Sequence, residues 1–298
     1  MVAQPYGTDL GACSVPELGR RLAEHRYYAD DGLSTAIHLA LVLGRPLALE
    51  GEPGVGKTQV AKVLADVLGR ELIRLQCYEG LDVSQALYEW DHPKQLLHVR
   101  VAEAQGRDVG ELYDERFLLE RPLLRAVRAA PGAVLLIDEV DRSDSEFEAF
   151  LLEFLSDFQI TIPELGTVRA VQPPIVVLTS NRTRELHDAL KRRCLYHWIE
   201  FPDAERARAI LRAHAPGLDE AAAASLVDAI QRVRTEKLLK RPGIAETIDW
   251  ALGARTLADE GAAWPEALRR SLGLLLKEQE DVERVAGRPE LFDPSVRV

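Results

Sequence analysis

The residues from Gly51 to Thr58 have the types and spacing of a phosphate-binding loop. Their sequence, GEPGVGKT, places glycines where a backbone must curl, and a lysine and a threonine directly after the last glycine. Successive N–H groups of such a loop face a phosphate, the lysine reaches the β- and γ-phosphates, and the threonine hydroxyl binds Mg²⁺. An apolar strand precedes the loop and an amphipathic helix follows it, which favours a nucleotide site over a glycine-rich turn without a ligand. The predicted nucleotide-binding residues are Gly51, Glu52, Pro53, Gly54, Val55, Gly56, Lys57, Thr58 and Gln59.

A pair of acids, Asp138 and Glu139, ends the apolar run AVLLIDEV (133–140). A continuous apolar run predicts a strand buried on both faces of a parallel sheet, with the two carboxylates at its carboxyl end. There Asp138 can hold Mg²⁺ through water, and Glu139 can polarise a water for in-line attack on the γ-phosphate. We therefore predict hydrolysis, with Thr58 and Asp138 as metal-binding residues and Lys57 and Glu139 as catalytic residues.

Asn181 ends a further apolar run, PPIVVLTSN (173–181), and should emerge at the same sheet edge as Asp138. A neutral amide at that place can orient the attacking water, so Asn181 is a further predicted catalytic residue. The alternative is an asparagine that simply starts a turn.

Three cations, Lys191, Arg192 and Arg193, stand together in DALKRRC (188–194), although the chain has a formal net charge of -11. Cations at the C-terminal end of a helix complement the negative pole of its dipole, which is the simplest interpretation. The second interpretation, that these cations serve the nucleotide site, depends on the rest of the chain.

The composition is that of an ordinary globular protein of 298 residues, 47% of them hydrophobic and 29% charged. No apolar run is long enough to span a bilayer, and the N-terminus does not have the regions of a secretory signal. The three cysteines, Cys13, Cys77 and Cys194, are far apart and indicate neither disulfides nor a metal site, so we expect a cytoplasmic protein. The acidic balance disfavours broad nucleic-acid binding, which depends on neutralising phosphates.

Strand and helix patterns alternate over the first 200 residues, whereas residues 82–130 are expected to be mostly helical and 203–298 entirely so. This order predicts an α/β fold, a P-loop core with a central parallel β-sheet flanked by helices, followed by a C-terminal all-helical lid domain. The predicted divisions are an N-terminal arm (1–20), the nucleotide-binding core (21–202) and the lid (203–298).

Taken together, GEPGVGKT, LLIDEVDRSD and VVLTSNRTRELHDALKRRC resemble the motifs of an AAA+ ATPase, a resemblance that covers about residues 20–298. The chain looks most like the MoxR branch, which has an insert in the second helix, expected here within 80–115, and a hairpin before the sensor strand, expected at 159–171. Within that branch, QCYEGLDVSQALYEW, ERFLLERPLLRA and DFQITIPELGTVRA resemble the CoxD-type ATPases.

The resemblance assigns roles to several cations. Arg193 best matches an arginine that reaches into the ATP site of the neighbouring subunit, and Arg192 is the second candidate. Arg241 is the candidate for a lid arginine that binds nucleotide, with Lys240 as the alternative, although here the arginine precedes the proline instead of following it. Arg142 is either a second interface cation or one half of a surface salt bridge.

The resemblance also implies a function. A homo-oligomer, expected to be a hexamer, would use ATP and Mg²⁺ to remodel a client protein as a chaperone does. CoxD-type ATPases are associated with the maturation of metal centres in molybdenum hydroxylases such as carbon-monoxide dehydrogenase, together with a von Willebrand A-domain partner. Two other classes stay open: a nucleic-acid-stimulated motor, which would need a basic or aromatic pore, and a non-hydrolysing nucleotide switch, against which Glu139 argues.

Overall fold

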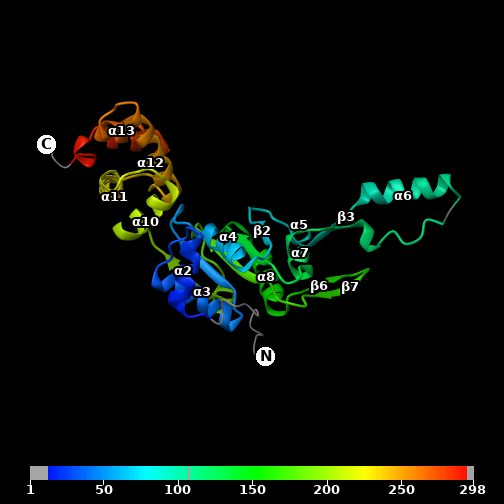
Figure 1. The fold of residues 1–298 in the computed structure, drawn as a ribbon. Coiled ribbons are helices and arrows are strands. Elements are labelled where there is room, and N and C mark those ends of the chain that lie inside the picture. Colours follow the sequence, from blue (N-terminus) through cyan, green and yellow to red (C-terminus); the bar gives the residue numbers. More distant parts are fainter. Residues whose placement is uncertain (1–12, 107, 294–298) are drawn as a thin grey trace. The chain divides into compact units, whose positions relative to one another are not determined.

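The chain divides into two compact units in a computed structural model that describes residues 13–106 and 108–293 (Figure 1). The first unit comprises the residues up to His25, Ala29–Glu50 and Lys57–Trp198. The second comprises Arg26–Tyr28, Gly51–Gly56 and the residues from Ile199 on. The helical unit therefore begins a few residues before the division expected at Pro202, and it includes the glycine-rich loop.

A five-stranded sheet with the order β2-β5-β8-β1-β9 forms the centre of the first unit. Its strands are β1 (Leu47–Gly51), β2 (Leu72–Gln76), β5 (Val134–Asp138), β8 (Ile175–Ser180) and β9 (Leu195–Ile199). β5 pairs in parallel with β2 on one side and β8 on the other, and β8 pairs in parallel with β1. Every residue of β1, β5 and β8 is buried, as the continuous apolar runs predict.

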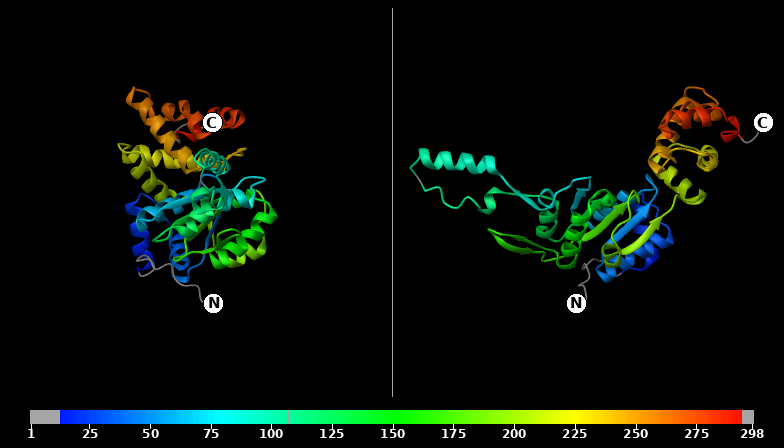
Figure 2. Two further views of the ribbon diagram at one scale, coloured as in Figure 1. Left: turned by 90° about the vertical axis from the view of Figure 1, so that its right-hand side faces the viewer. Right: turned by 180° about the vertical axis from the view of Figure 1, so that it is seen from behind.

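Helices flank this sheet, so the predicted α/β core is confirmed (Figure 2). They are α2 (Val15–Glu24), α3 (Asp31–Leu43), α4 (Lys57–Leu68), α5 (Val83–Leu87), α7 (Pro122–Arg128), α8 (Ser145–Asp157) and α9 (Asp188–Arg193). The α8 helix begins where the Asp144 carboxylate accepts a hydrogen bond from the Phe147 amide at 2.8 Å. Its apolar face, which includes Phe147, Leu151 and Phe154, is buried in the core of this unit.

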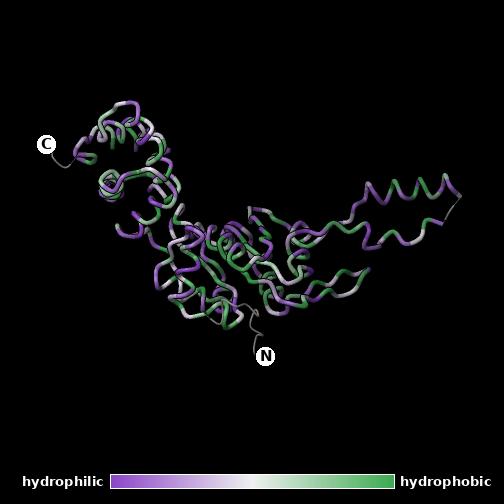
Figure 3. Tube along the Cα trace, viewed as in Figure 1, coloured by the Kyte–Doolittle hydropathy of each residue, from purple (hydrophilic) through white to green (hydrophobic). Residues whose placement is uncertain are grey.

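A long excursion, which we call the insert arm (residues 88–120), departs from the core and returns to it. It consists of β3 (Tyr88–Trp90), α6 (His92–Ala104), the 3-10 turn η1 (Glu115–Phe117) and β4 (Leu118–Glu120), with β3 and β4 paired antiparallel. The expectation that 82–130 is mostly helical is confirmed by α5, α6 and α7, and the two short strands, which form a ribbon, were not expected. Along α6, hydrophilic and hydrophobic residues alternate in Figure 3.

The hairpin expected at 159–171 is present as β6 (Gln159–Ile162) paired antiparallel with β7 (Gly166–Arg169). The arm expected at 1–20 is different. Residues 1–12 lie outside the described residues, but α2 begins at Val15, capped by Ser14, and buries Leu18 and Leu22 completely. An arm with two fully buried leucines is part of the core, so its expected loose character is wrong from Val15 on.

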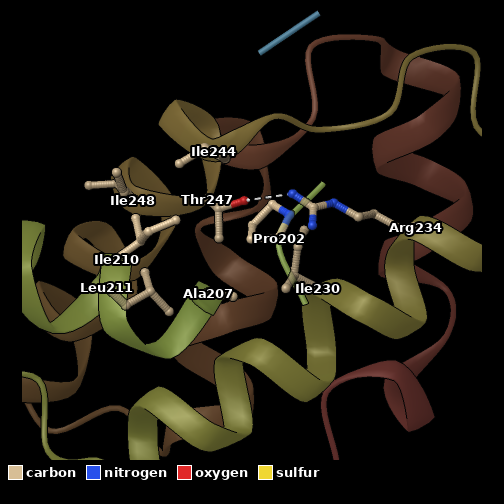
Figure 4. A pocket seen from close by; sticks show the side chains of 9 residues that line it. All are labelled: Pro202, Ala207, Ile210, Leu211, Ile230, Arg234, Ile244, Thr247 and Ile248. Carbon is tan, nitrogen blue, oxygen red and sulfur yellow. Dashed lines mark hydrogen bonds between the residues drawn. The ribbon is translucent and has the colours of Figure 1, made fainter. Parts of the chain in front are cut away.

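The second unit is helical after Ile199. Its helices are α10 (Ala204–His214), α11 (Glu220–Thr235), α12 (Ile244–Asp259), α13 (Trp264–Arg270), α14 (Leu272–Leu275) and α15 (Gln279–Ala286), with the 3-10 turn η3 (Pro289–Leu291). They enclose an apolar core around Trp250, whose indole N–H donates to the Leu268 carbonyl at 2.9 Å. A small cavity lies among Pro202, Ile210, Ile244 and Ile248, and its volume of about 20 Å³ suffices for a single water (Figure 4).

The guanidinium of Arg234 is at the border of this cavity. It stacks over the Phe201 ring at 4.2 Å and donates to the Pro242 carbonyl at 3.1 Å and to Thr247 Oγ1 at 3.5 Å. Burial lowers the pKa of Arg234 to about 10, which still leaves it charged at neutral pH. Arg234 therefore joins α11 to the start of α12.

None of the helices in the described part of the chain combines the length and apolarity needed to cross a membrane. None of the three cysteines, all of which lie in the described residues, forms a disulfide. Burial raises the pKa of Cys77 to about 12, and the nearby carboxylates of Asp138, Asp141 and Glu139 add to the shift. Burial likewise raises the pKa of Cys194 to about 12.

These shifts lead to a first prediction. Because the thiolate is the reactive form, Cys77 and Cys194 should remain unreactive toward a thiol reagent at pH 8, whereas the partly exposed Cys13 should react. Absorbance of the released chromophore should count one thiol per native chain and three after denaturation. A Cys13→Ser variant, the control, should show none before unfolding. Rapid modification of all three thiols in the native protein would contradict the prediction.

Candidate active site

The glycine-rich loop has the left-handed backbone that its sequence predicts. Gly54 has φ +80° and Gly56 has φ +94°, values that residues with side chains rarely adopt. Gly54 also packs against Gly243 at the start of α12, where a Cβ on either residue would come within 2.8 Å of the other's Cα. The Gly54 carbonyl accepts a hydrogen bond from the Ile244 amide at 2.8 Å. Two glycines thus allow the loop and α12 of the second unit to touch through their backbones.

Asp138 lies at the carboxyl end of β5, with its side chain 4% exposed. Its Oδ1 atom accepts hydrogen bonds from Thr58 Oγ1 at 3.0 Å and from Thr179 Oγ1 at 2.5 Å. The fold therefore brings together the two predicted metal-binding residues, which are far apart in the sequence. Mg²⁺ is usually bound through one or two carboxylates, phosphate oxygens and water, so this set of oxygen donors fits the metal.

Glu139 directly follows β5 and has a left-handed backbone, with φ 55° and ψ 47°. Its amide donates to Thr179 Oγ1 at 3.0 Å, which helps to hold this uncommon conformation. Its carboxylate accepts hydrogen bonds from Gln76 Nε2 at 2.9 Å and from the predicted partner Asn181, through Nδ2, at 3.5 Å. Arg142 Nε lies 3.2 Å from the same carboxylate. Glu139 and Asn181 therefore meet at one edge of the sheet, as the strand pattern predicts.

Asp141, which the sequence did not single out, positions the residues after β8. Its buried carboxylate accepts hydrogen bonds from the Asn181 amide at 3.2 Å and the Thr183 amide at 2.8 Å. The Thr183 hydroxyl donates to it as well, at 2.7 Å. Asp141 thereby fixes the turn that carries Asn181. The signal that could have found it is a third acid three residues after Asp138, at the same sheet edge.

Strand β2 contributes two further residues that sequence reasoning missed. Gln76 is paired in register with Asp138 and reaches Glu139, as described above. Arg74, two residues earlier and on the same side of β2, donates from both Nε and Nη2 to Asp138 Oδ2, at 3.0 and 2.5 Å. Their period-two spacing predicts that both side chains lie on one face of β2, but it does not predict that β2 borders β5.

The two arginines of α9 differ in their side-chain hydrogen bonds. Arg193 is hydrogen-bonded within its own chain, to the Leu152 carbonyl and the Ser156 hydroxyl of α8. Arg192 is exposed and has no hydrogen bond or ion pair with any described residue. Both arginines are exposed, so the difference between them is that only the guanidinium of Arg193 is hydrogen-bonded to described residues.

Arg241 is exposed and lies two residues before Gly243, which contacts Gly54. Within the described residues, Arg241 adds no hydrogen bond to that contact. Lys240, the alternative, is also exposed, and its amide donates to Asp281 at 3.2 Å. Arg142 pairs with Glu139 of its own chain, which corresponds to the salt-bridge alternative for that residue. The described residues contain no cluster of three or more histidine, cysteine or acidic side chains suited to a metal.

A family model described as the AAA domain (dynein-related subfamily) matches residues 46–194, which is half of the chain. The chain belongs to this family. The matched region contains the glycine-rich loop, Asp138, Glu139 and Asn181, and it is an ATP-hydrolysing AAA domain.

Several known proteins are similar to this chain. The chaperone protein ClpB of Mycoplasma genitalium is 31% identical over 132 residues, 44% of this chain and 16% of ClpB. The uncharacterized protein YehL of Escherichia coli K12 is 27% identical over 173 residues, 55% of this chain and 43% of YehL. The chain thus spans less than half the length of either relative.

A solved structure of a RuvB mutant from Thermotoga maritima has a TM-score of 0.50 and 20% identity, covering 84% of this chain and 69% of that one. At this identity the likeness concerns the fold alone. The AAA fold, with its central sheet and C-terminal helical region, is therefore supported by structure as well as by sequence.

The contacts of Asp141 generate a second prediction. Asp141→Ala removes the acceptor of two backbone amides and one hydroxyl, and should lower the free energy of unfolding by about 3 kcal/mol, measured by urea denaturation. Asp144→Ala, which removes only the cap of α8, should cost about 1 kcal/mol and serves as control. Because Asn181 loses its anchor, ATP hydrolysis by Asp141→Ala should also fall below that of the control. Equal losses of stability in the two variants would contradict this positioning role.

Proposed function

We propose that this protein couples Mg²⁺-dependent ATP hydrolysis to the remodelling of a client protein. The observation that carries the proposal is the arrangement at the edge of the sheet. Asp138 shares a hydrogen bond with Thr58, and Glu139 lies beside Asn181, at the ends of adjacent parallel strands. This arrangement supports the proposal that one carboxylate holds a metal and that the carboxylate of the next residue accepts a proton.

Each residue then has a distinct role in hydrolysis. The backbone amides of the loop and Lys57 bind the phosphates, and Thr58 and Asp138 would hold Mg²⁺. Bound Mg²⁺ neutralises charge on the β- and γ-phosphates. Glu139 accepts a proton from the attacking water, and Asn181 orients that water. The Glu139 carboxylate must first exchange the hydrogen bond from Gln76 and the ion pair with Arg142 for one with water.

A third prediction tests the role of Glu139. Glu139→Gln keeps the size of the side chain but not the base, so phosphate release should fall at least about 100-fold while ATP binding is retained. Glu146→Gln changes an exposed glutamate on the surface of α8 and should leave turnover unchanged. Turnover by Glu139→Gln at the level of the unchanged protein would exclude this residue as the base, and would leave nucleotide binding without hydrolysis as the alternative.

We place an arginine from a neighbouring subunit at each ATP site of a homo-oligomer, which we expect to be a hexamer. The family resemblance favours Arg193 for this role, whereas Arg192 is favoured by a guanidinium that has no hydrogen bond to a described residue. For Arg193 to act on another subunit, its hydrogen bonds to Leu152 and Ser156 must first be released. Either guanidinium would stabilise charge on the transferring phosphoryl group.

A fourth prediction separates the two arginines. Arg192→Ala and Arg193→Ala are each assayed alone and after mixing with Glu139→Gln, which is inactive but has both arginines. The variant without the trans-acting arginine should lose most phosphate release and regain part of it on mixing, because interfaces with an intact Glu139 facing an intact arginine reappear. Lys191→Ala is the matched control and should remain active. Full activity of both arginine variants would contradict the trans-acting role and would favour the simpler interpretation, in which the cations complement the dipole of α9.

A protein client suits the insert arm better than a nucleic acid does. The arm has eight acidic and four basic residues, and α6 exposes Leu96, Leu97 and Val101, at 65%, 63% and 43%. An acidic surface repels phosphate, whereas exposed apolar side chains favour protein contacts. The proteins similar to this chain include the chaperone ClpB, which supports the same class of function.

The finer proposal follows from the resemblance to MoxR and CoxD-type ATPases. It is a cytoplasmic ATPase that helps to mature the metal centre of a molybdenum hydroxylase such as carbon-monoxide dehydrogenase, with a von Willebrand A-domain partner. The test is to capture proteins on Glu139→Gln in the presence of ATP. Recovery of a hydroxylase subunit or of a von Willebrand A-domain protein would support the proposal, and recovery of nucleic acid alone would refute it.

A further inference from the structure

The Asp138 carboxylate forms an ion pair with the side chain of Arg74. Arg74 Nε and Nη2 both donate to Asp138 Oδ2, at 3.0 and 2.5 Å. The other oxygen, Oδ1, accepts from the hydroxyls of Thr58 and Thr179. Arg74 thus donates to Oδ2, the carboxylate oxygen of Asp138 to which neither threonine donates.

This ion pair differs from an ordinary surface salt bridge in its burial. The Asp138 side chain is 4% exposed, whereas that of Arg74 is 52% exposed. A carboxylate removed from water must be paired, so Arg74 compensates a charge that would otherwise be unpaired in the core. The guanidinium itself is half exposed, and it belongs to β2, which is an edge strand of the sheet. It can therefore move away without disturbing the packing of the core.

We propose that Arg74 is a displaceable counter-ion of Asp138, which occupies the carboxylate in the metal-free protein and must leave when Mg²⁺ binds with nucleotide. This inference rests on the proposed function, because it assumes that Asp138 serves the metal. If Thr58 and Asp138 hold Mg²⁺, the metal and the guanidinium would compete for one carboxylate, because two cations beside it repel each other. Arg74 therefore raises the Mg²⁺ concentration that the site requires.

The displacement also affects Glu139. Arg74 Nη2 donates to Gln76 Oε1, which turns the Gln76 NH₂ group toward Glu139, where it donates to Oε2 at 2.9 Å. When the guanidinium leaves, the Gln76 amide loses the contact that sets its orientation. Arrival of the metal is thereby linked, through Arg74 and Gln76, to the release of the carboxylate that accepts a proton from water.

The experiment compares Arg74→Gln with the unchanged full-length protein, using a fluorescent ATP analogue as the probe. Mg²⁺ is titrated at a fixed concentration of the analogue, and the half-saturating Mg²⁺ concentration is read from the fluorescence change. The ion pair between Arg74 and Asp138 should weaken Mg²⁺ binding by about tenfold or less. Its removal in Arg74→Gln should therefore lower the half-saturating Mg²⁺ concentration about fivefold. Arg74→Lys, which keeps the charge but not the paired donors, should give a smaller decrease.

Thermal unfolding supplies a readout that does not depend on turnover. In EDTA, Arg74→Gln should unfold at a lower temperature than the unchanged protein, because Asp138 is left buried and unpaired. With Mg²⁺ and the analogue present, this difference should disappear, since the arginine has already left. Arg125→Gln removes a similarly exposed arginine that pairs with Glu71 outside the site, and it should not alter the Mg²⁺ dependence.

An unchanged half-saturating Mg²⁺ concentration, or an equal loss of thermal stability in both conditions, would overturn the proposal, because Arg74 would then remain in place beside the metal. Failure of the proposed function has a different signature. In that case neither protein binds the analogue in a Mg²⁺-dependent manner, and Lys57→Ala binds it as well as the unchanged chain does.

Discussion

A single buried carboxylate organises the edge of the sheet in this protein. Asp138 is almost completely removed from water at the end of a strand that is itself buried on both faces, and a charge in that position is tolerated only if it is fully hydrogen-bonded and paired. Its partners come from three elements: Thr58 from α4, Thr179 from β8 and Arg74 from β2. The need to satisfy this one group therefore draws together residues that the chain supplies more than 100 positions apart.

The position of β5 between β2 and β8 makes this convergence possible. Parallel strands end at a common edge, so the residue that terminates each strand faces its neighbours across about one strand spacing. Gln76 and Asp138 are register partners, and Asn181 directly follows β8. The polar groups are thus positioned by the backbone of the sheet, and their short side chains need little further ordering. The Asp141 carboxylate also stabilises this edge, because it accepts hydrogen bonds from the turn that follows β8.

Much of this architecture follows from local patterns in the sequence. The apolar runs that become β1, β5 and β8 are uninterrupted and end in Glu50-Gly51, Asp138 and Ser180-Asn181, so both the strands and the residues at their ends could be predicted. The ribbon of the insert arm was missed because YEW and LLE are only three residues long and have no clear alternation. The pairing of Arg74 with Asp138 was missed for another reason, because it depends on which strand lies beside β5. Pairing order is a property of the whole sheet, and no local pattern contains it.

The backbone of Glu139 has a consequence for how this site tolerates change. A glutamate with φ 55° is in a conformation that costs a residue with a Cβ about 1 kcal/mol relative to glycine, and it persists because the amide is anchored to Thr179. Glu139 thus combines an uncommon backbone conformation with the side chain that, under the proposed function, accepts the proton. On that proposal, function and folding make opposite demands on position 139, because a glycine would relax the turn but would have no carboxylate. Selection for stability alone would favour glycine at this position, so the cost of keeping a glutamate is what the proposed role in hydrolysis would explain.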